Sequence, residues 1–252
     1  MKIVISPAKS LDYERQLPTG DFTIPMFLSK SRKIHKVLKQ QKPSDLSSLM
    51  DISDKLADLN WQRNKKWKTP FTPQNARQAL FAFNGDVYVG MDAYTIPVEK
   101  IEIIQEKLRI LSGLHGLLKP LDLIQPYRLE MGTQLAVEDS RNLYDFWRDT
   151  VTKALNKELK KGELFVNLAS KEYFDVIDTK KLKVPVITPE FKDYKDGDLR
   201  IVSFYAKKAR GMMVRYIIES GAETVDDLKG FNYEGYFFDA NLSNDKHLIF
   251  TR

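Results

Sequence analysis

The alternation of short apolar runs with longer amphipathic segments is the feature that most constrains the fold of this chain. Apolar runs of strand length occupy residues 2–6, 164–168, 184–188 and 199–205. Apolar residues recur at helical spacing in residues 25–40, 44–66, 97–111, 144–159 and 206–220. Interleaved strands and helices predict a mixed α/β fold with helices around a mixed sheet. With 252 residues and no low-complexity linker, we expect one large domain over residues 1–252.

Turn and capping residues add weaker local predictions. Thr72 and Pro73 indicate a helix that starts there and runs through Leu80. Residues 84–93 are rich in turn formers, and residues 117–134 indicate an ordered loop. Thr224 followed by Asp227 predicts a capping box for a short helix. The segments 235–240 and 246–251 predict a closing β-hairpin.

The composition excludes several classes of site. The chain has no cysteine, which rules out disulfides, thiolate nucleophiles and cysteine-ligated metals. Its three histidines lie far apart in sequence, so we expect no metal site and no cofactor, although carboxylate-only binding of magnesium or iron stays open. No apolar run approaches the ~20 residues of a spanning helix. We therefore expect a cytoplasmic, soluble protein that uses neither a membrane nor an obligate protein partner.

Positive charge is concentrated in two segments. The net charge is +6, but residues 29–68 hold eleven Lys or Arg against four Asp, and residues 195–216 hold six against two. Concentrated charge favours a basic surface patch, and the expected partner of such a patch is double-stranded DNA bound largely without regard to sequence.

Two segments carry side chains that have both a structural and a functional interpretation. Residues 6–12 follow the first strand and contain Lys9 and Asp12, which either face solvent or face a cleft at the strand's carboxyl end. The segment lacks the glycines of a nucleotide P-loop. Residues 83–93 contain Asp86 and Asp92, which serve either as turn residues or as paired carboxylates for acid–base chemistry.

The sequence Gly113-Leu114-His115-Gly116 has the pattern of the hairpin in a helix-hairpin-helix element, which we place near residues 98–125. In such a hairpin the glycines bring backbone N–H groups close to a DNA phosphate, and the next helix would start near Lys119. Pro120 restricts that second helix to a short one. A plain helix C-terminus explains the same glycines.

The segment 203–216 is the most distinctive one. On a helix its four cations, Lys207, Lys208, Arg210 and Arg215, fall within an arc of about 160°. Gly211 lies inside that arc, although a glycine within a helix costs ~1 kcal/mol. Close approach of a sugar-phosphate backbone explains this glycine, and so does a packing contact on a solvated helix face.

Six motifs spread over the chain carry a family resemblance. They are SPAKSLD at 6–12, FNGDVY at 83–88 with GMDA at 90–93, LSGLHGLLKPLD at 111–122, PYRLEMG at 126–132, LASKEY at 168–173 and FYAKKARG at 204–211. With these motifs the sequence resembles the bacterial peroxide stress protein YaaA family over essentially its whole length. The resemblance implies a role in the oxidative stress response, with protection of DNA, limitation of free iron and a basic DNA-binding cleft that includes a helix-hairpin-helix element.

From these observations we predict a DNA-binding protein of the peroxide stress response, and we keep an enzymatic function as the alternative. The predicted DNA contacts are Lys9, Gly113, Gly116, Lys119, Lys207, Lys208, Arg210, Gly211 and Arg215. The resemblance implies no established enzymatic activity, so we favour a binding protein. The alternative is a glycosylase or lyase for damaged DNA. For it the candidate catalytic acids are Asp12, Asp86 and Glu172, with Asp92 and Glu130 also available, and Tyr88, Tyr127 and Tyr173 as candidates for stacking on a base. Direct iron binding by carboxylates is a third hypothesis.

Overall fold

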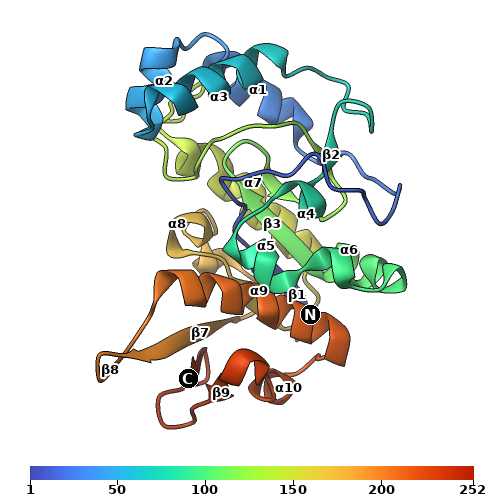
Figure 1. Ribbon diagram of the computed structural model, residues 1–252, viewed down its shortest axis with the longest axis vertical. Helices are drawn as coiled ribbons and strands as arrows, with labels where there is room; N and C mark the ends of the chain where they lie inside the picture. Colours follow the sequence, from blue (N-terminus) through green and yellow to red (C-terminus); the bar gives the residue numbers. More distant parts are fainter.

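A mixed eight-stranded β-sheet runs through the computed structural model, which describes residues 1–252 (Figure 1). The strand order is β4-β3-β1-β6-β7-β10-β9, and β8 pairs with β7. Five neighbouring strands are parallel: β3 (Leu108–Ser112), β1 (Lys2–Ile5), β6 (Phe165–Leu168), β7 (Val186–Lys195) and β10 (His247–Thr251). The three antiparallel strands are β4 (Gly116–Leu118), β8 (Asp198–Arg200) and β9 (Phe237–Phe238). The mixed α/β class is therefore confirmed.

Strand β1 lies at the centre of the sheet because its sequence suits burial on both faces. All four of its residues are buried, and three of them are Ile3, Val4 and Ile5. Such a continuous apolar run is typical of parallel strands covered by helices on both sides. Ile3 pairs with Leu108 of β3 and with Val166 of β6, so β1 has a parallel neighbour on each side.

The helices form groups at different places around the sheet (Figure 1). Helices α1 (Leu28–Leu38), α2 (Pro43–Met50) and α3 (Asp54–Lys66) lie together at one end of the molecule, and α10 (Val225–Lys229) lies at the other end with β9. The remaining helices are α4 (Ala79–Ala82), α5 (Asp86–Met91), α6 (Ile101–Lys107), α7 (Leu143–Glu158), α8 (Lys171–Phe174) and α9 (Ser203–Ser220). A small separate sheet pairs β2 (Arg77–Gln78) with β5 (Leu123–Ile124). None of the helices combines the length and the hydropathy that a membrane span requires.

Helices α5 and α9 cross at unusually close range, and two glycines make this possible. A Cβ atom on Gly90 would lie 2.0 Å from the Lys208 carbonyl oxygen, and one on Gly211 would lie 1.8 Å from the Val87 carbonyl oxygen. Either methyl group would overlap the backbone of the other helix. The backbone that approaches Gly211 is therefore that of α5, so the packing explanation for this glycine is the correct one.

Several predicted elements are confirmed. The strands at 2–6 and 164–168, the helices at 25–40, 144–159 and 206–220, and the antiparallel pairing in the C-terminal tail are all present. Thr224 and Asp227 form the predicted capping box, in which each side chain accepts a hydrogen bond from the other residue's backbone N–H.

Other predictions are wrong in type or in extent. The single helix predicted at 44–66 is two helices, and residues 84–93 contain helix α5 instead of only turns. The helix predicted from Pro73 through Leu80 is a turn followed by β2 and the start of α4. The strand predicted at 199–205 ends at Arg200, because α9 begins at Ser203.

The helix-hairpin-helix prediction is wrong. Helix α6 ends at Lys107, and the chain continues as β3, which pairs with β1. Residues 113–115 are the turn of a β-hairpin between β3 and β4, and they are buried. The Trp147 indole N–H donates a hydrogen bond to the Gly113 carbonyl oxygen at 2.9 Å, and a Cβ atom on Gly116 would lie 2.5 Å from the Trp147 ring. Gly116 makes room for the Trp147 ring, and a Cβ atom on Gly113 would lie 2.3 Å from the Leu129 carbonyl oxygen, so each glycine serves a contact in the core and neither presents a surface to DNA.

Candidate functional site

The carboxyl ends of β1 and β6 mark the point at which chain connections leave the sheet in opposite directions. The connection after β1 leads to β3 on one side, and the connection after β6 leads to β7 on the other side. In open α/β sheets such a switch point leaves a crevice in which ligands bind. Ser6 directly follows β1, and Ser170 follows β6 by two residues. The Ser170 backbone N–H donates to the Ser6 Oγ at 2.9 Å, which joins the two strand ends.

A cleft of about 430 Å³ lies at this switch point. Residues 6–10, 84–88, 170, 172 and 173 line it, together with Lys207 and Arg210 of α9. Three of the predicted DNA-binding cations, Lys9, Lys207 and Arg210, therefore line one cleft, although Lys9 lies about 200 residues before the other two in sequence. Two of the three candidate catalytic acids, Asp86 and Glu172, line the same cleft.

The cations of the cleft differ in how far the protein already neutralises them. Lys9 pairs with Glu130, whose carboxylate Oε1 lies 3.1 Å from the lysine Nζ and 3.1 Å from an Nη of Arg128. Lys207 and Arg210 form no hydrogen bond or ion pair. Arg210 is nevertheless only partly exposed, and burial lowers the pKa of its guanidinium by more than the Glu190 carboxylate, which forms no ion pair with it, raises that pKa. A partly buried cation without a partner is costly, and an anion in the cleft would remove that cost.

A second hollow adjoins the cleft at Asn84, which lines both. It has a volume of about 730 Å³ and is lined by two acids, Asp12 and Glu14, and by three cations, Arg15, Arg63 and Lys66. Asp12 accepts hydrogen bonds from the backbone N–H groups of Glu14 and Arg15, and these bonds, that to Arg15 first, lower the pKa of its carboxyl. The carboxylate thus fixes a turn at the rim of this second hollow and is not in the cleft with Asp86 and Glu172.

Two cations of α9 that were predicted to bind DNA form hydrogen bonds or ion pairs with other residues of the chain. Lys208 pairs with Glu234, away from the cleft. Arg215 donates to the carbonyl oxygens of Met91 and Asp92 at the end of α5 and pairs with Glu219. Gly211 lies between these residues in the α5–α9 contact. Of the four cations in the predicted arc on α9, only Lys207 and Arg210 therefore remain available to a ligand in the cleft.

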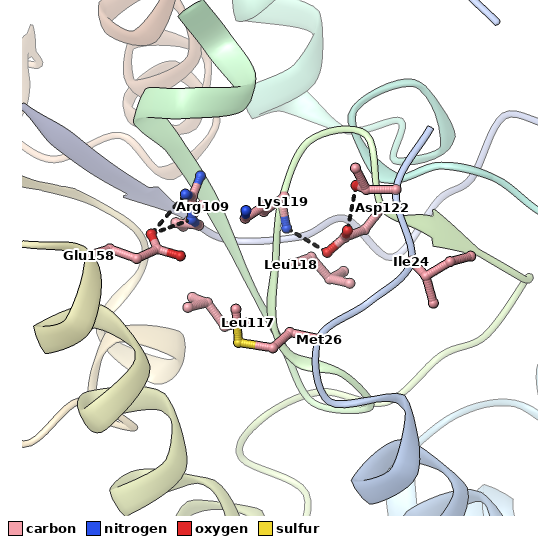
Figure 2. Close-up of a pocket in the computed structure, with 9 residues that line it drawn as sticks. Ile24, Met26, Arg109, Leu117, Leu118, Lys119, Asp122 and Glu158 are labelled. Atoms are coloured by element: carbon pink, nitrogen blue, oxygen red, sulfur yellow. Dashed lines mark hydrogen bonds and ion pairs between the residues drawn. The ribbon is translucent and has the colours of Figure 1, made fainter. Parts of the chain in front are cut away.

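Lys119 lies in a separate hollow of about 250 Å³ beside the edge strand β4 (Figure 2). Most of the polar groups there are already paired. The Arg109 guanidinium lies 2.7 Å from the Glu158 carboxylate, and Asp122 accepts hydrogen bonds from the Thr23 hydroxyl and from the backbone N–H of Lys119 (Figure 2). This arrangement ties the 22–26 segment and α7 to the sheet, and it does not bring Lys119 to the cleft.

The three tyrosines named as possible stacking partners are buried, with exposed fractions of 6–8%. Tyr88 donates its hydroxyl hydrogen bond to the Ser6 carbonyl oxygen at 3.1 Å, and the Tyr127 hydroxyl is paired with that of Ser112 at 2.6 Å. Tyr173 lines the cleft but is buried as well. Asp92 caps the end of α5 in a left-handed conformation and is bonded to the Thr95 hydroxyl.

Sequence reasoning missed Ser6, Asn84 and Ser170 as lining residues, as well as Arg63 and Lys66 of the second hollow. A signal for the serines exists, because each comes just after an apolar run of strand length, where parallel strands place their ligands. Arg63 and Lys66 belong to the basic segment 29–68, but nothing in the sequence shows which of its eleven cations meet the cleft side of the molecule.

The fold and the cleft define an α/β protein with a ligand-sized cleft at the carboxyl edge of its parallel strands, lined by three cations and two acids. A sequence model for the family described as peroxide stress protein YaaA matches residues 1–242. The chain is 71% identical to a UPF0246 protein of Flavobacterium johnsoniae and 66% identical to one of Flavobacterium psychrophilum, in each case over the full length of both chains. It is 52% identical to a UPF0246 protein of Hahella chejuensis, over all of this chain and 99% of that one. The chain therefore belongs to the peroxide stress protein YaaA family.

Proposed function

We propose that this protein binds double-stranded DNA, largely independently of sequence, and that the cleft and the adjoining hollow receive the phosphate backbone. The observation that carries the proposal is the presence of two unpaired cations, Lys207 and Arg210, at the switch point of the sheet. Phosphate oxygens supply the charge-assisted hydrogen bonds that a guanidinium and an ammonium group lack there.

The two hollows together are lined by six cations. Lys9, Lys207 and Arg210 line the cleft, and Arg15, Arg63 and Lys66 line the hollow that meets it at Asn84. These six cations come from the two basic segments of the sequence and from the N-terminal 15 residues. Backbone contacts of this kind give affinity without sequence preference.

Two neighbouring lysines of α9 give a matched test. Lys207→Gln and Lys208→Gln remove the same charge at adjacent positions, but only Lys207 lines the cleft. We expect Lys207→Gln to weaken duplex binding by about 1–2 kcal/mol, which is roughly five- to thirtyfold, and Lys208→Gln to change it little. Fluorescence anisotropy with a labelled duplex measures both. Equal effects of the two variants would refute the assignment of the cleft.

A second candidate function, base-directed chemistry on damaged DNA, is favoured by the acids in the cleft. A cleft of about 430 Å³ matches the size of small-molecule sites, so besides contacting the backbone phosphates of a duplex it has room to enclose one extruded nucleotide. Asp86 and Glu172 would then be placed beside that nucleotide. Incubation with duplexes that contain an abasic or oxidised base tests this function. Strand scission that Asp86→Asn or Glu172→Gln abolishes, with binding retained, supports it.

We further propose that the protein acts in the cytoplasm and that its part in the peroxide response is to shield DNA and to lower free iron. The family description supports the connection with peroxide stress. Metal analysis of the purified protein after incubation with ferrous iron tests whether it lowers iron by holding the metal.

A further inference from the structure

Three exposed aromatic side chains surround one open hollow next to the cleft. Tyr194 at the end of β7 is 69% exposed, and Phe204 and Tyr205 at the start of α9 are 57% and 43% exposed. All three line the same hollow of about 610 Å³, which lies where the β7–β8 hairpin faces the first turn of α9. Large aromatic side chains are normally buried, so three of them around one exposed hollow indicate a contact surface.

The C-terminal residue Arg252 contacts several of the residues around this hollow. The Arg252 guanidinium lies 4.7 Å from the centre of the Tyr205 ring and 4.5 Å from that of Tyr236. Arg252 also pairs with the buried Asp193 carboxylate at 2.6 Å, and the Tyr236 hydroxyl donates to the same carboxylate at 2.9 Å. The backbone N–H of Tyr194 donates to the Arg252 carbonyl oxygen. Arg252 and its partners therefore hold the Tyr205 ring and the backbone of Tyr194 in place.

Helix α9 contributes residues to both the hollow and the cleft. Phe204 lines the hollow and Lys207 lines the cleft, and these two residues lie one helical turn apart, on the same side of the helix. Lys195, which forms no ion pair, lines the hollow from the hairpin side. A strand whose phosphates contact Lys207 therefore has the Phe204 side of the hollow one helical turn away.

We propose that this hollow binds unpaired bases of DNA by stacking on Tyr194, Phe204 and Tyr205. The proposal rests on the proposed function, because it assumes that a nucleic-acid backbone occupies the cleft. Every base has a flat π-face, so exposed aromatic rings beside a row of cations bind single strands without sequence preference. Two cations, Lys195 within the hollow and Lys207 one helical turn from Phe204, favour a polyanion over an apolar protein surface as the occupant.

The test uses the full chain with two labelled ligands: single-stranded oligothymidylate of about 20 nucleotides and a duplex of the same length. The double variant Tyr194→Ala with Phe204→Ala is compared with Phe237→Ala, which removes a ring that is 64% exposed on β9 and outside the hollow. We expect the double variant to bind oligothymidylate about tenfold more weakly or worse and the duplex within about twofold of wild type. Phe237→Ala should match wild type on both ligands, and Tyr194→Trp should retain single-strand binding.

The outcomes separate this proposal from the proposed function. If wild type binds the duplex but not oligothymidylate, or if the double variant binds oligothymidylate as wild type does, the stacking site is refuted and the duplex-binding function stands. If wild type binds neither ligand, the stacking site and the duplex-binding function are both refuted. If the double variant keeps its affinity for both ligands but changes its sedimentation coefficient, the aromatic surface is a protein contact, and the proposal is overturned.

Discussion

Replacement of Gly211 by alanine tests the close crossing of α5 and α9. The added Cβ atom would lie 1.8 Å from the Val87 carbonyl oxygen and 2.7 Å from the Met91 nitrogen. Both are backbone atoms within a helix, so no side chain can move aside, and the two helices must separate by about an ångström or more. That separation loosens the contacts of Val87 and Met212, which are almost fully buried.

The expected change in the free energy of unfolding of Gly211→Ala is the sum of two opposing effects. Overpacking of a core costs up to about 3 kcal/mol, and the better helix propensity of alanine returns about 1 kcal/mol. We therefore expect Gly211→Ala to lower the free energy of unfolding by about 2 kcal/mol, which in a chain of this size lowers the melting temperature by roughly 4–8 °C.

Thermal melting followed by circular dichroism measures this effect, and DNA binding by the folded variant is measured in parallel. Gly20→Ala is the control, because a Cβ atom there has no neighbour within 4 Å and the residue has no left-handed conformation. We expect the control to melt like wild type. If Gly211→Ala melts like the control and loses DNA affinity, the glycine faces a ligand, and the packing explanation is refuted.

Three further predictions concern the buried hairpin and its surroundings. Burial lowers the pKa of His115 to about 3, so the folded state keeps the imidazole neutral while the unfolded chain binds a proton below about pH 6.5. The free energy of unfolding should therefore fall as pH is lowered from 6.5 towards 4.5, with His115 contributing up to about 1.4 kcal/mol per pH unit. His115→Asn should reduce the slope by that amount in urea titrations at the two pH values, while His35, whose pKa burial also lowers, keeps its own contribution. Trp147→Phe removes the donor to the Gly113 carbonyl oxygen and should cost about 2 kcal/mol by the same titration; an unchanged midpoint would contradict the assignment. Gly116→Val should abolish cooperative melting, because its side chain would overlap the Trp147 ring and its φ of 70° is unfavourable for valine, whereas a normally melting variant would show that the turn adapts.

Residues 97–111 show why the sequence predicts one class of element and the structure contains another. Ile101, Ile104, Leu108 and Leu111 fit one continuous helix by their spacing. The chain nevertheless changes to β3 at Leu108, where it pairs with β1, and Leu108, Ile110 and Leu111 are all buried. A strand that is buried on both faces shows no alternation, so its pattern does not differ from that of a buried helix. The helix-hairpin-helix prediction required a helix directly before Gly113, and it is wrong because strand β3 occupies that position.

The candidate site was predicted in part, and the reason is again physical. Lys9 follows a strand that the sequence predicts correctly, and Lys207 lies on a helix that the sequence predicts correctly, and both line the cleft. Arg210, Lys208 and Arg215 share one predicted helical arc, but only Arg210 reaches the cleft, because Glu234 and the carboxyl end of α5 occupy the other two. Such partners come from segments that are distant in sequence, and helical spacing contains no information about them.

The salt dependence of duplex affinity tests the central claim most directly. If four to six phosphates are neutralised, the logarithm of the association constant should fall with the logarithm of salt concentration at a slope of about −4 to −5. The double variant Lys207→Gln with Arg210→Gln should reduce the magnitude of that slope by about 2, because two of the contacts are lost, while Lys208→Gln should leave it near the wild-type value. An affinity that stays flat between low and moderate salt, or a slope that the double variant does not change, would contradict binding of DNA in the cleft.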